Sequence, residues 1–235
     1  MNIEREMIIR ILELTRSKSV SHGTINENVK VLSHIAQKLL QKLQNEGLIN
    51  AQTGIIKADT TQRLGLAVRA VSLGADLEAV SRLLQWQEFE TMAAFALAQN
   101  GYNVTRNLRF KHGGRRWEID IVGCRKPLVM CIDCKHWQRR LSLSELKKIV
   151  DKQIERTKAL AKSLPDPSIK VECVKWDYAR FTPSVLSLVE GNFRFLDDVP
   201  IVPVFKLQDF LNNLPVYAGS LQHFTKSPTT KLEDY

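Results

Sequence analysis

The sequence predicts an α/β protein, with a mixed sheet flanked by helices that follows a mainly helical N-terminal region. Two observations predict this order. Apolar residues recur at helical spacing through much of residues 3–84, whereas residues 102–136 hold three extended segments joined by loops that contain glycine. Helices and strands alternate from there on, which is typical of a layered sheet domain. We therefore expect domains at residues 1–84 and 85–220, and a polar tail at 221–235.

The N-terminal region is expected to consist of helices and one hairpin. Gly47 is a usual C-terminal signal of a helix, and Gln52-Thr53-Gly54 forms a turn between two apolar pairs. The expected elements are helices at residues 3–15, 24–31 with Thr24 as N-cap, 33–46 with Ser33 as N-cap, and 60–84 with a break at 73–76 where Asp76 caps the next helix, together with a hairpin at 48–56.

Three short helices followed by a hairpin resemble the winged helix-turn-helix domain found in many transcription regulators. The resemblance covers about residues 1–60 and is one of pattern, without a diagnostic motif. It implies that helix 33–46 is a recognition helix, with Lys38 and Lys42 among the polar residues on its outer side. The alternative is a helical packing or dimerisation domain, and the sequence leaves both open.

The second half of the chain is expected to form the sheet. Its first three strands are joined by His112-Gly113-Gly114 and by residues 123–127, which are both good hairpin connections, so these strands form a meander. The expected elements are helices at residues 86–99, 143–164, 182–190 and 207–213, and strands at 102–111, 115–122, 128–136, 169–174 and 200–205.

The charge of the chain favours a polyanionic partner. Its formal net charge is +9 and its pI is about 9.5. Residues 104–116 carry five basic residues and no acid, and residues 135–162 carry nine basic residues against three acids. A phosphate backbone would lie against these clusters. The basic residues expected to contact DNA there are Arg109, Lys111, Arg115, Arg116, Arg139 and Arg140.

Composition and cysteine spacing exclude several classes of protein. No apolar run approaches the roughly 18 residues needed to span a bilayer, and the first six residues lack the order of a signal peptide, so we expect a soluble cytoplasmic protein. Cys131 and Cys134 have no second Cys or His pair at zinc spacing, and a strand would point them to opposite faces. With Cys124 and Cys173 they are expected to be buried thiols.

Two carboxylates and a lysine are expected to converge at the end of the second hairpin. Asp133 and Lys135 share a face of their strand, and Asp120 can lie beside Asp133 across the ladder. Such carboxylates bind Mg²⁺, which activates water and neutralises charge during phosphodiester hydrolysis, and a lysine can orient that water. The alternative is a solvated ion pair. Charged residues are unusual at the end of an apolar strand, however, which favours a functional role.

These residues resemble the PD-(D/E)xK nuclease superfamily, with the Mrr-type restriction endonucleases and the archaeal Holliday junction resolvases as the best match. The resemblance covers roughly residues 86–165. Asp120 matches the first strand acid, and Asp133-Cys134-Lys135 matches the acid-x-lysine signature. Glu90 matches the acid on the preceding helix.

Two acids differ from the family pattern, and a third is an alternative candidate for the helix acid. Many relatives have Glu where this chain has Asp133, and either acid can bind the metal. Glu118, with Trp117, replaces the Gly that often precedes the first strand acid. It is either a further ligand or a solvated rim residue, and we prefer the latter. Glu88 is the rival to Glu90, and spacing favours Glu90.

The resemblance implies a restriction-endonuclease-like fold and a metal-dependent endonuclease that hydrolyses DNA phosphodiester bonds, of restriction, repair or junction-resolving type. Mg²⁺ or Mn²⁺ would be held by Glu90, Asp120, Asp133 and the Cys134 carbonyl. Lys135 would position the attacking water. By the same analogy the products carry 5′-phosphate ends and the enzyme is a homodimer, and an unidentified protein partner is a further expectation.

The alternative function is a non-catalytic DNA-binding regulator that keeps the nuclease fold as a scaffold, because a fold does not guarantee activity. All the signature acids and the lysine are present, which favours the enzyme. His136 should face away from Lys135 in the strand. Gln153 and Lys152 lie on the basic helix and could reach the cleft, where relatives often have a polar residue, but we slightly prefer the alternative that they lie on a solvated face.

Overall fold

The computed structural model describes residues 2–16, 18–29, 31–135, 137, 141–188 and 190–226. The chain divides into two compact units, Met1–Phe89 and Glu90–Tyr235, which are described one at a time. Within the described ranges, no helix has both the length and the apolar character that a membrane crossing requires.

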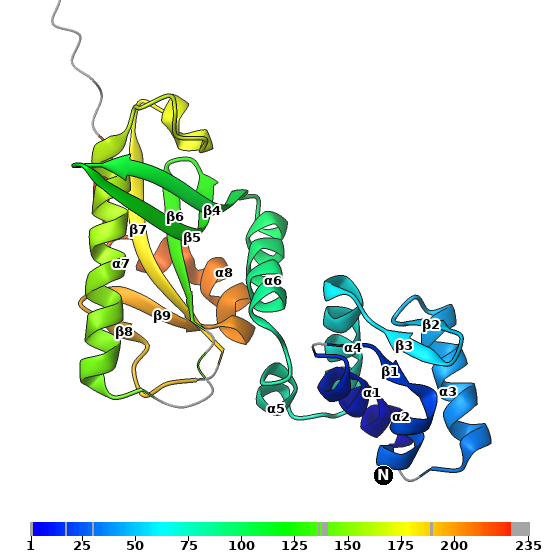
Figure 1. Cartoon of the computed structure of the whole chain (residues 1–235). Coiled ribbons are helices and arrows are strands. Elements are labelled where there is room, and N and C mark those ends of the chain that lie inside the picture. Colours follow the sequence, from blue (N-terminus) through cyan, green and yellow to red (C-terminus); the bar gives the residue numbers. More distant parts are fainter. Residues whose placement is uncertain are drawn as a thin grey trace, which may run out of the picture. The chain divides into compact units, whose positions relative to one another are not determined.

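The first unit is mainly helical, as the sequence predicts (Figure 1). Its small antiparallel sheet has the strand order β1-β3-β2. The elements of the unit are α1 (Ile3–Leu14), β1 (Val20–Ser21), α2 (His22–Val29), α3 (Ser33–Asn45), β2 (Asn50–Gln52), β3 (Ile55–Lys57), α4 (Thr60–Ser72) and α5 (Leu77–Ser81).

Caps explain most of the helix boundaries in this unit. Asp76 caps α5 by accepting a hydrogen bond from the Ala79 amide at 2.8 Å, as predicted. Asp59 and Gln62 form a capping box at the start of α4. Two predicted caps are wrong: α2 begins at His22, upstream of Thr24, and Ser33 is the first residue of α3, with Leu32 at its N-cap position.

The second unit is built on a seven-stranded mixed sheet. The strand order is β4-β5-β6-β7-β9-β8, and β10 pairs with β7. The first three strands are antiparallel, whereas β6, β7 and β9 run parallel. The elements are α6 (Trp86–Gln99, which begins in the first unit), β4 (Asn103–His112), β5 (Arg115–Arg125), β6 (Leu128–Lys135), α7 (Leu143–Ser163), β7 (Ala179–Ser187), β8 (Phe195–Leu196), β9 (Val199–Pro203), α8 (Leu207–Tyr217) and β10 (Phe224–Lys226).

Helices cover both faces of this sheet, so the predicted fold class is confirmed (Figure 1). On one face, Leu160 of α7 packs in a core with Val129 and Cys131 of β6. On the other face, α6 approaches β5 so closely that a Cβ at Gly123 would lie 3.3 Å from the Leu97 side chain. Glycine at this position therefore permits the close contact between helix and sheet.

Two predicted elements are wrong. The strand expected at residues 169–174 is absent, and a short 3₁₀ helix, Glu172–Lys175, lies there. The helix expected at residues 182–190 is instead β7, the strand between β6 and β9. β10 consists of residues that the sequence places in the polar tail, and it pairs antiparallel with β7.

Candidate active site

Asp133 and Lys135 meet at the C-terminal end of β6. The Asp133 side chain is buried, with only 1% of its surface exposed, and Lys135 is about a third exposed. The Lys135 Nζ atom lies 2.9 Å from Asp133 Oδ1 and 2.8 Å from Oδ2. Both side chains point to the α7 side of the strand, because alternate residues of a strand share a face.

Arg156 of α7 also contacts Asp133, which sequence reasoning missed. Its Nη1 atom lies 2.5 Å from Asp133 Oδ1. The Asp133 carboxylate therefore faces two cations, one from its own strand and one from the helix that covers it. This pairing offsets the large cost of burying a carboxylate.

Gln153 corrects an expectation about α7. The sequence placed it on a solvated face, but its side chain is fully buried and donates a hydrogen bond from Nε2 to the Cys131 carbonyl at 2.7 Å. Its Oε1 atom is buried without a hydrogen-bond partner within the described part of the chain. Lys152 is exposed, as expected. Gln153 and Arg156 are three residues apart and so lie on one side of the helix, but this spacing alone does not show what that side faces.

Asp120 of β5 lies next to β6, and the antiparallel register that pairs Ile121 with Ile132 brings it beside Asp133, as predicted. Its Oδ2 accepts a hydrogen bond from the Cys134 amide at 2.8 Å. Burial raises the pKa of the Asp120 carboxyl, and the nearby charges of Asp133 and Glu90 raise it further, against the opposing effects of the Cys134 amide and Lys135. Negative charge is thus concentrated at Asp120, a favourable setting for a cation.

This raised pKa predicts the effect of Asp120→Asn on stability. A carboxyl whose pKa is higher in the folded than in the unfolded protein lowers stability above its folded pKa, where it must be charged. Asparagine keeps an acceptor for the Cys134 amide and removes the charge. We expect Asp120→Asn to raise the melting temperature at neutral pH by a few degrees in EDTA.

The gain should shrink as pH falls through the folded pKa, because wild-type Asp120 then becomes neutral, and it should vanish below the ordinary value of 3.8. Calorimetry over a pH series measures this. Asp177→Asn, at an exposed carboxyl, is the control. A lower melting temperature for Asp120→Asn at neutral pH would contradict the argument.

Glu88 and Glu90 have different partners on α6. Glu88 forms a buried ion pair with Arg63, at 2.5 Å from Arg63 Nε to Glu88 Oε1. Glu90 is also buried, and its Oε2 lies 3.6 Å from Nη2 of Arg106 on β4. The charge of Glu90 affects Asp120, which lies in the same unit. Glu88 is therefore held in an ion pair with Arg63, and the role of Glu90 stays a prediction.

The four cysteines are free and buried, as predicted. Cys131 packs in the core under α7. Burial and the neighbouring charges of Asp120 and Glu90 raise the pKa of the Cys134 thiol. Among the described residues, no three His, Cys, Asp or Glu side chains form a ready cluster for a metal ion.

The predicted DNA-contacting residues of the β4–β5 hairpin are exposed. Arg109 pairs across the strands with Glu118, at 3.0 Å from Nε to Oε2, and Glu118 is a half-exposed residue at the rim. Arg115 lies over the Trp117 ring, 4.3 Å from its centroid. Lys111 and Arg116 extend the same basic surface. Arg139, Arg140 and His136 lie outside the described residues.

The first unit presents the predicted outer side of α3. Lys38 is exposed. Lys42 is half-exposed, and its Nζ lies 2.7 Å from Glu4 Oε2 on α1. Glu4 is only 14% exposed and also pairs with Arg69, so Lys42 could turn to another anion while Glu4 keeps a cation.

Comparison with known proteins finds one family model and one relative of similar sequence. Residues 85–175 match the family model described as NERD, the nuclease-related domain. An uncharacterized protein from Archaeoglobus fulgidus is 30% identical over 138 residues, which cover 57% of this chain and 95% of that protein.

Solved structures give weaker likenesses. Protein VC1899 from Vibrio cholerae is 13% identical with a TM-score of 0.44, and the match covers 93% of this chain and 53% of that one. The restriction endonuclease FokI is 13% identical with a TM-score of 0.37, covering 94% and 44%. This chain spans about half the length of these solved proteins.

Proposed function

This chain belongs to the same protein family as the Archaeoglobus fulgidus protein and carries a match to the nuclease-related domain, and we propose that it is a metal-dependent endonuclease that hydrolyses DNA phosphodiester bonds. The observation that carries the proposal is the meeting of Asp133 and Lys135 at the end of β6, with Asp120 bonded to the amide between them. We propose a restriction, repair or junction-resolving type of reaction.

The donor chemistry of the site fits Mg²⁺ or Mn²⁺. Mg²⁺ is usually bound by one or two carboxylates together with water and substrate phosphate, so three clustered protein ligands are not required. Asp120 has no ion-pair partner among the described residues, and its pKa is raised mainly by burial and further by the negative charges of Asp133 and Glu90. The residues that would hold the ion are Asp120, Asp133 and Glu90, with the Cys134 carbonyl. The bound ion would supply an activated water and neutralise charge on the phosphate.

The protein's own side chains would do the positioning. Lys135 Nζ, fixed by Asp133, would orient the attacking water and add positive charge beside the phosphate. Arg156 contacts the same carboxylate through Oδ1, an oxygen that it shares with Lys135. Both hydrogen bonds go to Asp133 Oδ1, whereas Oδ2 is buried without a hydrogen-bond partner among the described residues, so Oδ2 is the oxygen that would bind a metal ion in competition with the nearby Lys135 ammonium.

The proposed DNA surface is the exposed basic hairpin of β4 and β5. Its phosphate contacts would come from Lys111, Arg115 and Arg116, with Arg109 shared with Glu118. Lys38 and Lys42 on α3 would provide a second contact in the first unit. A homodimer, which would cut two strands, is part of the same proposal.

The proposal is tested by incubating the purified chain with linear duplex, single-stranded and four-way-junction DNA in Mg²⁺, Mn²⁺ or EDTA. We expect cleavage with either metal, none in EDTA, and none with Asp133→Asn. The preferred substrate would identify the type of nuclease.

Two results would contradict the proposal. Equal residual cutting by wild type and Asp133→Asn would indicate a contaminating nuclease. Tight DNA binding without cleavage of any substrate, unchanged in Asp133→Asn, would instead support the non-catalytic regulator.

A further inference from the structure

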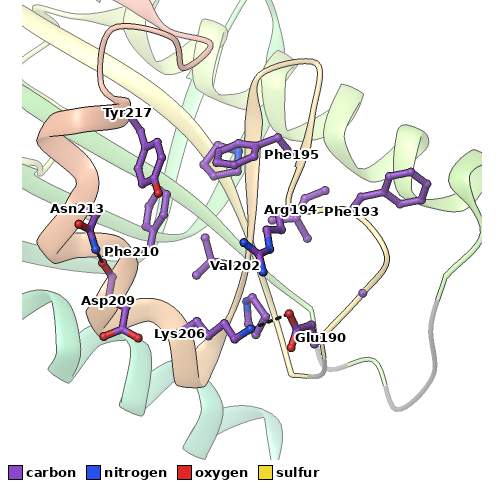
Figure 2. Close-up of a pocket in the computed structure, with 14 residues that line it drawn as sticks. Glu190, Phe193, Arg194, Phe195, Val202, Lys206, Asp209, Phe210, Asn213 and Tyr217 are labelled. Atoms are coloured by element: carbon purple, nitrogen blue, oxygen red, sulfur yellow. Dashed lines mark hydrogen bonds and ion pairs between the residues drawn. The ribbon is translucent and has the colours of Figure 1, made fainter.

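A cavity of about 340 Å³ lies at the far edge of the sheet, between α8 and the β8–β9 hairpin. Figure 2 shows Phe210 and Tyr217 on the α8 side, Phe195 opposite them, and Val202 between. The volume falls in the range of roughly 300–1,000 Å³ that small-molecule sites occupy. These residues lie beyond the part of the chain that matches the nuclease-related domain.

The aromatic rings of this cavity are partly open to solvent. Phe195 and Tyr217 are 41% and 38% exposed, which is unusual for large rings that a core could have buried. Their centroids are 5.9 Å apart and tilted by 52°, while Tyr217 and Phe210 lie nearly parallel at 6.2 Å. Such a cluster offers ring faces on which another flat ring can stack.

Polar groups around the rings suit a nucleotide. Within the described ranges the Arg194 guanidinium has no ion-pair partner, whereas Lys206 is paired with Glu190 at 2.7 Å. Asp209 and Asn213 are exposed on the α8 wall and can hydrogen-bond the edge of a base. The cavity thus combines stacking faces, an available cation and hydrogen-bonding groups.

Strand register places this cavity at the same end of the parallel strands as the candidate active site, two strands away, although Val202 faces it from the side of the sheet opposite Asp133 and Lys135. Lys135 on β6 pairs with Ser187 on β7, and Ser187 pairs with Pro203 on β9, which lines the cavity. Two strand spacings amount to about 10 Å along the sheet. This span corresponds to roughly three nucleotides at the spacing of one DNA strand.

We infer that this cavity binds one unpaired nucleobase of the nucleic-acid substrate, near the phosphate that is cut. The base stacks on Phe195 and Tyr217, Asp209 or Asn213 contacts its edge, and Arg194 contacts the adjoining phosphate. This inference rests on the proposed function, and it adds a preference for DNA in which a base is already unpaired, as in a single strand, flap or junction.

The test measures binding of a short fluorescent single-stranded oligonucleotide to the full chain in EDTA. We expect Tyr217→Ala and Phe195→Ala each to weaken single-strand binding roughly tenfold, because base stacking on an aromatic side chain has about that effect. Binding of fully paired duplex should be unchanged. Val216→Ala is the matched control, because Val216 is 80% exposed on α8 and does not line the cavity.

An abasic scan supplies a second, independent readout. One abasic position along the oligonucleotide should reproduce the loss of affinity, and at that position Tyr217→Ala should cause no further loss, because both changes remove the same contact. Additive losses at every position would overturn the inference. So would a change in oligomeric state of Tyr217→Ala on sedimentation, which would make the rings a protein interface.

The two proposals fail in different ways. Metal-dependent cleavage and DNA binding that are the same in Tyr217→Ala and wild type would keep the nuclease and reject the base site. If the wild type neither binds nor cuts DNA, the nuclease proposal fails. Saturation-transfer NMR with the mononucleotide dGMP then tests the cavity directly, and no transfer, or equal transfer with Tyr217→Ala, would reject the base site as well.

Discussion

Lys135→Ala is expected to lower the rate of DNA cleavage by about 10²–10⁴-fold, the usual contribution of one positioned acid–base group, with DNA affinity changed by only a few-fold. The reason is geometric. Lys135 Nζ is fixed against both oxygens of Asp133 and is about a third exposed, so it can reach a phosphate at the end of β6. Single-turnover cleavage measures the rate, and binding in EDTA measures the affinity.

Lys135→Ala is also expected to leave the fold intact. Arg156 still pairs with the buried Asp133 carboxylate when Lys135 is removed, so we expect the fold to persist. Lys170→Ala is the matched control, because this exposed lysine lies outside β6 and α7, and the described part of the chain shows no ion pair for it. Cleavage at the wild-type rate would exclude Lys135 from catalysis. A loss of affinity as large as the loss of rate would make it a binding residue only.

The sequence predicted the centre of the sheet well because local signals are strong there. Gly113 and Gly114 both have positive φ in the turn between β4 and β5, a conformation that glycine adopts without strain. A tight turn fixes the register of the strands beside it. Alternation within β6 then places Asp133 and Lys135 on one face. The Asp133–Lys135 pair of the candidate site can therefore be predicted from the spacing of these residues in the sequence.

β7 was mispredicted because it is a central parallel strand. Such strands are buried on both faces, and their continuous apolar runs cannot be told from a buried helix by periodicity. Val185, Leu186 and Leu188 gave that ambiguous pattern. Pro183 within the strand also counts against a central position, because it cannot donate to the ladder. Only the observed pairing with β6 and β9 decides whether such a segment is a strand or a helix.

Long-range partners were the other part that could not be predicted. Arg156 is one of many basic residues on α7, and nothing in the local sequence distinguishes the one that contacts Asp133. Gln153 is the same kind of case. The helical period shows which residues share a side of α7, but the residue that they face depends on how the helix packs against the sheet.

Arg63 and Glu88 form a buried ion pair in the first unit that the sequence analysis did not predict. Their side chains are 3% and 1% exposed. Arg63 donates further hydrogen bonds to the carbonyls of Leu12 and Leu83 and to the Thr15 hydroxyl. The other carboxylate oxygen of Glu88 accepts from the Gln85 amide at 2.7 Å. One guanidinium thus connects α1, α4, the end of α5 and the start of α6.

Arg63→Ala is therefore expected to destabilise the first unit by about 3–5 kcal/mol, the usual cost of removing one partner from a buried ion pair. Glu88 would be left charged and buried, and three acceptors would lose their donor. For a unit of this size each kcal/mol lowers the melting temperature by roughly 4–8 °C, so calorimetry should show a large shift or no folded first unit.

The double variant Arg63→Met with Glu88→Leu separates charge from hydrogen bonding. Replacing both partners of a buried ion pair by apolar residues is often close to neutral. Here the carbonyls of Leu12 and Leu83 stay without their donor, so we expect only partial recovery of stability. Arg82→Ala is the control, because its ion pair with Glu78 is half-exposed on both sides and should contribute less than about 0.5 kcal/mol. Equal melting temperatures for Arg63→Ala and Arg82→Ala would show that the buried pair does not hold the unit together.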